Sequence, residues 1–372
     1  MRSDRRQAHR VHRSQDLPQR GAAGVRSSGV SLVDDLVWLI DIPSVTGDEA
    51  ALRDAVASRL GHLQPRVVGN SVVVGTRTGR PLIVLYGHLD TVPVQGNLPA
   101  RVEGGRVHGL GASDMKSGLA VMIALLEDAG VARGPFDLMG VFYDAEEGPA
   151  AGNGLERVLD ESPDLGAAEF SIVMEPTDGE LQLGCQGAIN ATVEFHGTAA
   201  HSARPWLGEN AITRAGEWLS EMHRRSWRDV DVAGLTFKET FAVTTASGGV
   251  ARNVIPATFT LNLNHRFPPD RSMEQAEAMV HEVCRAADRV EVIDRAPAAP
   301  IPHGNPHLDR LEALVEVVAA KTAWTDVARL TERGLAAVNY GPGEVALAHR
   351  SDESVRVDSL ERCFAVMRRF LG

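Results

Sequence analysis

Cysteine and long hydrophobic runs are both scarce in this sequence. Its 372 residues include three cysteines, Cys185, Cys284 and Cys363, which are widely spaced. That usage excludes a disulfide framework and a structural zinc knuckle, and it is typical of the reducing cytoplasm. No hydrophobic run approaches the roughly 20 residues that cross a membrane, and residues 1–30 lack the hydrophobic segment of a signal peptide. We therefore expect a cytoplasmic protein that does not bind membranes.

Positive charge is also in short supply. The formal net charge is −11, which argues against nucleic acid as the main partner, because proteins that bind the phosphate backbone present basic surfaces. Residues 1–30 depart from this trend with seven arginines and two aspartates. We expect this basic arm to be disordered or to reflect an upstream start codon, and the alternative is a tail that binds an acidic surface.

The rest of the chain has the composition of an ordinary globular protein, with 44% hydrophobic and 23% charged residues. A length of 372 residues predicts two domains. We expect residues 31–186 and 298–372 to form one domain, and residues 187–297 to form a second domain inserted into it. Prolines at positions 297, 300 and 302 mark the return linker.

The first domain alternates predicted strands and helices. Residues 82–87 are a continuous hydrophobic run, which is typical of a strand buried on both faces. Further strands are predicted at 67–76, 138–143, 171–174 and 336–340. Helices are predicted at 31–40, 115–126 and 308–320, from a capping box of Thr46 and Glu49 to about Leu60, and from a capping Asp358 to about 371. We predict an α/β domain with a mixed, mostly parallel sheet and helices on both faces.

The inserted segment has a different pattern. Strands are predicted at 188–195, 241–245, 258–266 and 290–293, with helices at 211–222 and 272–287. The order strand, helix, strand, strand, helix, strand predicts a ferredoxin-like α+β domain.

Histidine and acidic side chains follow the predicted strands of the first domain. They are His88 with Asp90, Asp114 after a glycine-containing loop, Glu146 with Glu147, Glu175, and His349 in a later loop. Each alone has an ordinary explanation, such as a helix-capping Asp114 or a solvated pair of glutamates. Parallel strands, however, gather their carboxyl ends at one edge of a sheet. Carboxylates that converge there would repel one another without a cation, so the pattern predicts a metal site.

The donor set suits a pair of zinc ions, because Zn²⁺ accepts imidazole nitrogen and carboxylate oxygen, although Co²⁺ or Mn²⁺ would also fit. Two close ions need a bridging carboxylate, for which we favour Asp114. Of the adjacent glutamates, one can bind metal while the other acts as general base toward water.

These motifs, in this order, resemble the di-zinc aminoacylase and carboxypeptidase family of metallohydrolases over residues 31–372. The resemblance implies that His88 and Glu175 hold one zinc ion and that Glu147 and His349 hold the other. It further implies a bridging Asp114, a cis peptide between Asp114 and Met115, Glu146 as general base and Asp90 as the residue that orients His88.

Further stretches, at residues 184–187, 200–206, 324–329 and 339–343, resemble the actinobacterial members that hydrolyse N-succinyl-LL-2,6-diaminopimelate. This resemblance implies a small-molecule N-acyl diamino acid substrate and a homodimer formed through the inserted lid domain, with His201 of one subunit stabilising the oxyanion in the other. The implied substrate contacts are Asn253 and Arg266, with Arg204 and Arg329 as weaker candidates that could equally form structural ion pairs. Ala145 stands where close relatives would have cysteine.

Other functions stay open at this point. An acetylornithine deacetylase or another aminoacylase would share the same metal ligands, and so would a dipeptidase. A non-catalytic binding protein with a degenerate site is the alternative from another class, although Glu146 and all five ligand positions are present.

Overall fold

The computed structural model describes residues 31–372, so the predicted basic arm lies outside the described residues. Two compact units make up the described chain. Residues 31–183, 302–319 and 329–372 form the larger unit, and residues 184–301 and 320–328 form the inserted unit. The segment 320–328, which we predicted to belong to the first domain, groups with the inserted unit.

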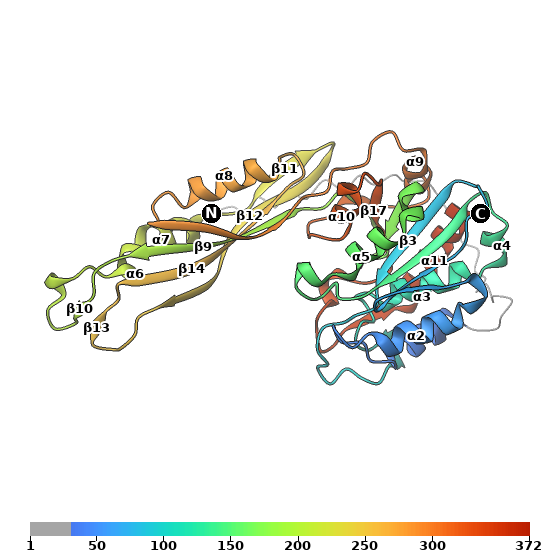
Figure 1. Ribbon diagram of the computed structural model, residues 1–372, viewed down its shortest axis with the longest axis horizontal. Coiled ribbons are helices and arrows are strands. Elements are labelled where there is room, and N and C mark those ends of the chain that lie inside the picture. The colour runs from blue at the N-terminus through green and yellow to red at the C-terminus, as the bar shows by residue number, and fades with distance from the viewer. Residues whose placement is uncertain (1–30) are drawn as a thin grey trace. The chain divides into compact units, whose positions relative to one another are not determined.

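An eight-stranded mixed sheet forms the centre of the larger unit (Figure 1). Its four central strands run parallel, in the order β6 (Asp137–Tyr143), β3 (Leu82–His88), β7 (Ala168–Val173) and β17 (Ala337–Asn339). Beside β6 lie β2 (Ser71–Val74) and β1 (Arg66–Val68), and beside β17 lie β8 (Leu181–Leu183) and β16 (Val318–Ala320). Every residue of β3 is buried, as its unbroken hydrophobic run predicts. The predicted mixed, mostly parallel sheet is confirmed.

Helices cover both faces of this sheet (Figure 1). They are α1 (Leu32–Ile40), α2 (Ala50–Arg59), α3 (Lys116–Leu126), α4 (Ala129–Ala132), α5 (Gly154–Glu161), α9 (Pro306–Glu312), α10 (Val327–Glu332) and α11 (Val357–Leu371). The helix α3 is buried along its whole length, since α1, α11 and the strands β3 and β6 all pack around it. Within residues 31–372, no helix combines the length and hydrophobicity needed to cross a membrane.

Several predicted helix ends were wrong. Glu49 precedes α2 without a capping side chain, and Thr46 instead donates a hydrogen bond to Asp90. The helix predicted at 308–320 stops at Glu312, because residues 318–320 pair as β16 at the edge of the sheet. Asp358 lies in the first turn of α11 and does not cap it.

The inserted unit is built on a five-stranded sheet in the order β11-β12-β14-β9-β15. These strands are β9 (Gly187–His196), β11 (Arg228–Val232), β12 (Leu235–Gly248), β14 (Thr258–Phe267) and β15 (Arg289–Ala296). Helices α6 (Ala211–Arg214), α7 (Gly216–Arg224) and α8 (Met273–Val283) join its strands. The order β12-β14-β9-β15 with these helices is the predicted ferredoxin-like arrangement, and β11 is an additional edge strand. The predicted helix at 211–222 is interrupted at Ala215.

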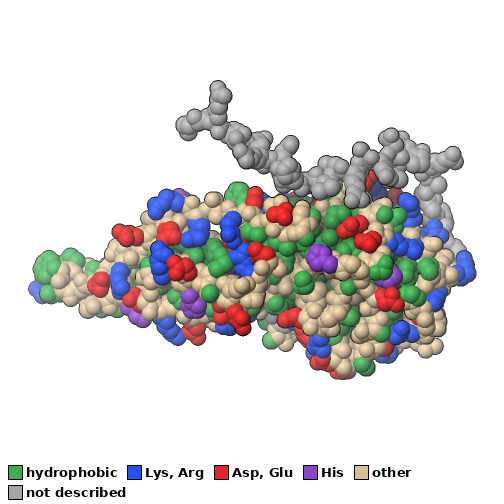
Figure 2. Space-filling model, turned by 90° about the horizontal axis from the view of Figure 1, so that it is seen from above, with side chains coloured by type: hydrophobic (Ala, Val, Ile, Leu, Met, Phe, Trp, Pro, Cys, Tyr) green, Lys and Arg blue, Asp and Glu red, His purple; other side chains and the backbone are tan. Residues whose placement is uncertain are grey.

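Alternation of hydrophobic and polar residues explains the core of the inserted unit. In β9 and β14 every second side chain is buried, and these side chains meet Trp218 of α7 and Val280 of α8. Figure 2 shows acidic and basic side chains interspersed over the visible face of the described residues.

Two smaller sheets were not predicted from the sequence. In the inserted unit, β10 (Ala200–His201) pairs with β13 (Val254–Ile255) as an antiparallel two-stranded sheet. In the larger unit, β18 (Ser354–Arg356) pairs with β5 (Arg106–His108), which pairs with β4 (Arg101–Glu103). The second of these sheets brings the segment after His349 beside the loop that carries Asp114.

Candidate metal centre

His88 is the last residue of β3, and its ring is buried. Its Nδ1 lies 2.9 Å from the backbone oxygen of Asp90 and 3.5 Å from the Asp90 carboxylate. An N–H at Nδ1 that donates to this carbonyl leaves Nε2 facing Asp114, 3.2 Å away. Burial disfavours the charged ring, but hydrogen bonds to Asp114 and Asp90 outweigh burial and raise the pKa of His88 above its ordinary value.

The carboxylate of Asp90 links the end of β3 to the loop after β6. Its oxygens accept hydrogen bonds from the backbone amides of Glu146 and Glu147, both at 3.0 Å, and from the Thr46 hydroxyl at 2.9 Å. Burial opposes ionisation of Asp90, but His88 and the two amides outweigh burial and lower the pKa of this carboxyl. Ala145 turns the loop with a left-handed backbone (φ 57°), which aims both glutamates at the site.

Asp114 lies between the two histidines that the sequence predicted to belong to one site. Its Oδ1 is 3.2 Å from Nε2 of His88, and its Oδ2 is 3.4 Å from Nε2 of His349. The peptide bond from Asp114 to Met115 is cis, which confirms the expectation. Burial raises the pKa of this carboxyl, but the two imidazoles outweigh burial and hold the pKa well below its usual range.

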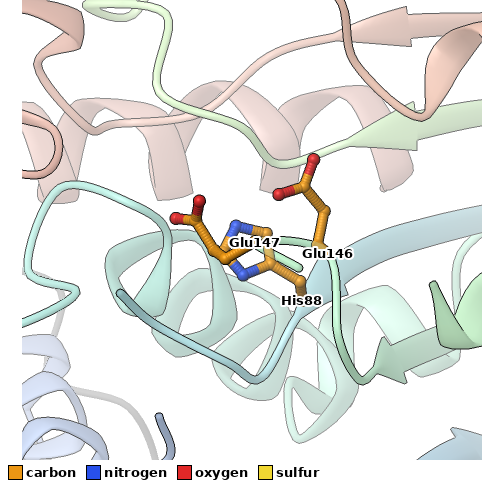
Figure 3. Close-up of side chains that lie close together, drawn as sticks. All are labelled: His88, Glu146 and Glu147. Atoms are coloured by element: carbon orange, nitrogen blue, oxygen red, sulfur yellow. The ribbon is translucent and has the colours of Figure 1, made fainter. Parts of the chain in front are cut away.

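Two further glutamates complete the cluster. Glu147 lies 2.8 Å from Nε2 of His349, and Glu175, just after β7, lies 4.0 Å from Nε2 of His88. Hydrogen bonds to Asp114 and Glu147 raise the pKa of His349 to about 10. Figure 3 shows the side chains of Glu146 and Glu147 on two sides of the His88 ring.

The structure thus brings six predicted side chains to one edge of the sheet. Their ligand atoms form three groups within 4.8 Å: His88, Asp114 and Glu175; Asp114, Glu147 and His349; and His88, Glu146 and Glu147. Imidazole nitrogen and carboxylate oxygen are the donors that zinc and similar ions accept. This donor set therefore fits a metal ion, and two of the groups share the carboxylate of Asp114.

Comparison with known proteins gives the family. The sequence profile described as peptidase family M20/M25/M40 matches residues 84–372. The chain belongs to this family. Family M20 enzymes depend on metal, in agreement with the donors gathered here.

Relatives of the M20 family match most of the chain. A Mycobacterium tuberculosis protein provisionally named succinyl-diaminopimelate desuccinylase DapE is 43% identical over 90% of this chain and 96% of its own length. The succinyl-diaminopimelate desuccinylase of Corynebacterium glutamicum is 36% identical over 92% of this chain and 98% of its own length. An acetylornithine deacetylase of Myxococcus xanthus is 30% identical over 79% of this chain and 80% of its own length.

Solved M20 structures show the same fold at low identity. A Staphylococcus aureus tripeptidase aligns with a TM-score of 0.76 at 19% identity, covering 94% of this chain and 98% of that one. A dinuclear metal-binding peptidase of Bacillus subtilis aligns with a TM-score of 0.65 at 16% identity, covering 91% and 96%.

Three predicted site residues of the inserted unit lie on or near the two-stranded sheet of β10 and β13. His201 is exposed on β10, and its carbonyl accepts a hydrogen bond from the amide of Arg204 at 2.8 Å. The carbonyl of Asn253 accepts a hydrogen bond from the amide of Ser202 at 2.9 Å. The pairing of β10 with β13 therefore brings the segment of His201 and Arg204 beside the segment of Asn253.

The other two predicted arginines lie elsewhere. Arg266 is on β14, where its Nε donates to Asn264 at 3.1 Å and where burial lowers the pKa of its guanidinium. Arg329, on α10, forms an ion pair with Glu156 at 3.0 Å. Such a structural ion pair is the alternative to a substrate contact that the sequence left open.

Sequence reasoning missed three residues that support this M20 site. Thr46 was read as part of a capping box, whereas its hydroxyl binds Asp90. Lys116 is buried, which lowers its pKa to about 7, and its Nζ donates to two backbone carbonyls at the C-terminal end of α1 and just beyond it. Glu353 is buried against the Asp114 loop, and burial raises its pKa to about 7. No local pattern marks these residues, because each acts on a distant segment.

Proposed function

We propose that this chain is a succinyl-diaminopimelate desuccinylase, a metal-dependent amidohydrolase. It hydrolyses N-succinyl-LL-2,6-diaminopimelate to succinate and LL-2,6-diaminopimelate, in lysine and diaminopimelate biosynthesis. The observation that carries the proposal is the intact cluster of metal donors in a chain whose two most similar relatives above bear this name. We assign the reaction to the cytoplasm, since the three cysteines are free and buried.

Two zinc ions fit the donor groups best, with Co²⁺ or Mn²⁺ as substitutes. His88 and Glu175 would hold one ion, Glu147 and His349 the other, and Asp114 would bridge them, because its two oxygens face the two imidazoles. When bound, the metal supplies polarisation of the amide carbonyl and a lower pKa for the attacking water.

Glu146 acts as the general base in this proposal. Its carboxylate takes a proton from the water that attacks the amide carbon, and it later gives that proton to the nitrogen as the carbon–nitrogen bond breaks. The backbone of Glu146 is held by Asp90 at 3.0 Å, so its position is fixed by a buried group. Asp90 thereby positions both the general base Glu146 and the ring of His88.

His201 would donate to the oxyanion in the active site of a second subunit. Its support is its position: it is exposed beside Trp206 and Leu207, which are 75% and 63% exposed. Such hydrophobic side chains favour burial against a partner. Figure 2 shows hydrophobic side chains gathered at one extremity of the described residues. We propose a homodimer through the inserted unit.

Mixing two inactive variants tests this arrangement. A heterodimer of Glu146→Ala and His201→Ala subunits has one site with both residues intact only if His201 acts across the dimer. The mixture should then recover up to about a quarter of the parent activity under random pairing, whereas each variant alone stays inactive. No recovery in heterodimers isolated through a different affinity tag on each variant would refute action across the dimer.

The substrate carries three carboxylates, so its pocket needs charged and amide donors. Arg266, Arg204 and Asn253 are our candidates for these contacts. Arg329 is a weaker candidate, because Glu156 already binds its guanidinium.

A kinetic panel with zinc present tests the substrate. We expect kcat/KM for N-succinyl-LL-2,6-diaminopimelate to exceed that for N-acetylornithine and for simple dipeptides by about 100-fold or more, since a missing carboxylate leaves donors of the pocket unpaired. A preference for N-acetylornithine would instead favour a deacetylase, the activity named for the 30% identical relative.

A further inference from the structure

Glu353 binds the loop that carries Asp114 through four hydrogen bonds. Its carboxylate accepts from the amides of Gly111, Ser113 and Asp114, each at 2.9 Å, and its carbonyl accepts from the amide of Gly109 at 3.1 Å. The residue is 2% exposed. These amides replace part of the water that burial removes from the carboxyl group, although burial still raises its pKa.

The same residue ends the loop that begins at His349. This loop is anchored at its start, where Gln95 donates to the carbonyl of His349 at 3.1 Å. Directly after Glu353, the chain enters β18, which pairs with β5. Glu353 lies 239 residues after Asp114 in sequence, and its carboxylate accepts a hydrogen bond from the amide of Asp114.

The two loops each supply one side chain, Asp114 or His349, to the same group of metal donors. Oδ2 of Asp114 and Nε2 of His349 are 3.4 Å apart. The Asp114 loop makes a further contact beside Asp114, where the Ser113 hydroxyl donates a hydrogen bond to the carbonyl of Glu344 at 2.8 Å. Glu353, the residue that ends the loop of His349, binds the backbone amide of Asp114 directly through its side chain.

We propose that Glu353 is a positioning residue that fixes Asp114 relative to His349 and so sets the affinity of this pair for a metal ion. The proposal rests on the metal centre of the proposed function, but it requires no particular substrate. Residues that orient metal ligands commonly change metal affinity about 10- to 100-fold when they are replaced.

The variant Glu353→Gln tests this role with little change in shape. The amide oxygen can still accept from Ser113 and Asp114, but the amide nitrogen faces the N–H of Gly111 and cannot accept from it. We expect zinc affinity, measured on metal-free protein by competition with a chelator, to fall at least about 10-fold. The visible absorption spectrum of the Co²⁺-loaded protein should change as well, because it reports ligand geometry. If this variant does not fold, Glu353→Asp, which keeps the charge but is one methylene shorter, should show the same two effects.

The matched control is Glu127→Gln, at the opposite end of α3. Glu127 forms an ion pair with Arg59 at 2.9 Å, so its loss should lower the melting temperature and leave zinc affinity and the Co²⁺ spectrum unchanged. If Glu353→Gln behaves like this control, Glu353 is only structural and the proposal is wrong. If the parent protein binds no zinc, the metal centre itself fails, and that outcome is separate from the first.

Discussion

Replacing Asp90 by asparagine should damage catalysis more than its effect on stability would suggest. The carboxylate of Asp90 accepts hydrogen bonds from Thr46 and from the backbone amides of Glu146 and Glu147. Asparagine has one acceptor oxygen, so its best orientation serves Thr46 and Glu147 and turns its NH₂ toward the N–H of Glu146.

The magnitude follows from these contacts. A buried N–H without an acceptor costs about 1–3 kcal/mol, and losing the charge weakens the two remaining bonds by about 1 kcal/mol in total. We therefore expect the unfolding free energy to fall by about 2–4 kcal/mol. A shift of about 1 Å in a catalytic group can cost about 100-fold in rate, so we expect kcat to fall about 100-fold as Glu146 loses its anchor.

A variant of a second buried aspartate, Asp137, separates the effect on stability from the effect on catalysis. Asp137 lies at the start of β6, at the opposite edge of the sheet from the site, and it accepts hydrogen bonds from Thr78, Gly79 and Arg80. Burial opposes its ionisation, but these donors outweigh burial and lower its pKa from 3.8 to about 2. At about 1.36 kcal/mol per pKa unit, Asp137→Asn should cost about 2.5 kcal/mol.

Urea unfolding of metal-free protein and kcat at saturating zinc are the two measurements. Both variants should lose similar stability, whereas only Asp90→Asn should lose most of its turnover. The reasoning would be refuted if Asp90→Asn kept kcat within about threefold of the parent, or if Asp137→Asn lost turnover equally.

Three further outcomes are expected. The depressed pKa of Asp137 means that its stabilisation is complete above about pH 4 and disappears as pH falls toward 2; the difference between the parent and Asp137→Asn in urea unfolding should shrink only in that range. The raised pKa of His349, about 10, means that the metal-free ring carries a proton at neutral pH; zinc binding should release protons, seen in calorimetry as a dependence on buffer ionisation enthalpy, and zinc affinity should weaken as pH falls. A methyl group at Gly343 would overlap the carbonyl oxygen of Ser113; Gly343→Ala should therefore lower zinc affinity or folded yield, whereas Gly166→Ala, at an open position, should change neither.

Much of the site was predictable because its chemistry follows strand ends. The hydrophobic run before His88 identifies β3, and the same pattern before Glu146 and Glu175 identifies β6 and β7. Parallel strands in one sheet must bring such positions to one edge. Residue type and local periodicity were therefore enough to predict which side chains could meet around a metal ion.

Tertiary structure alone decided how these side chains are held. Thr46 fits a capping pattern in sequence, yet its hydroxyl binds Asp90, and Glu353 has no local pattern that connects it with Asp114. These contacts join segments 44 and 239 residues apart. Hydrophobic periodicity reports which face of an element is buried, but it carries no information about which distant polar group will lie opposite. The candidate ligands could therefore be predicted from the sequence pattern, whereas the contacts that support them were decided by the packing of the folded chain.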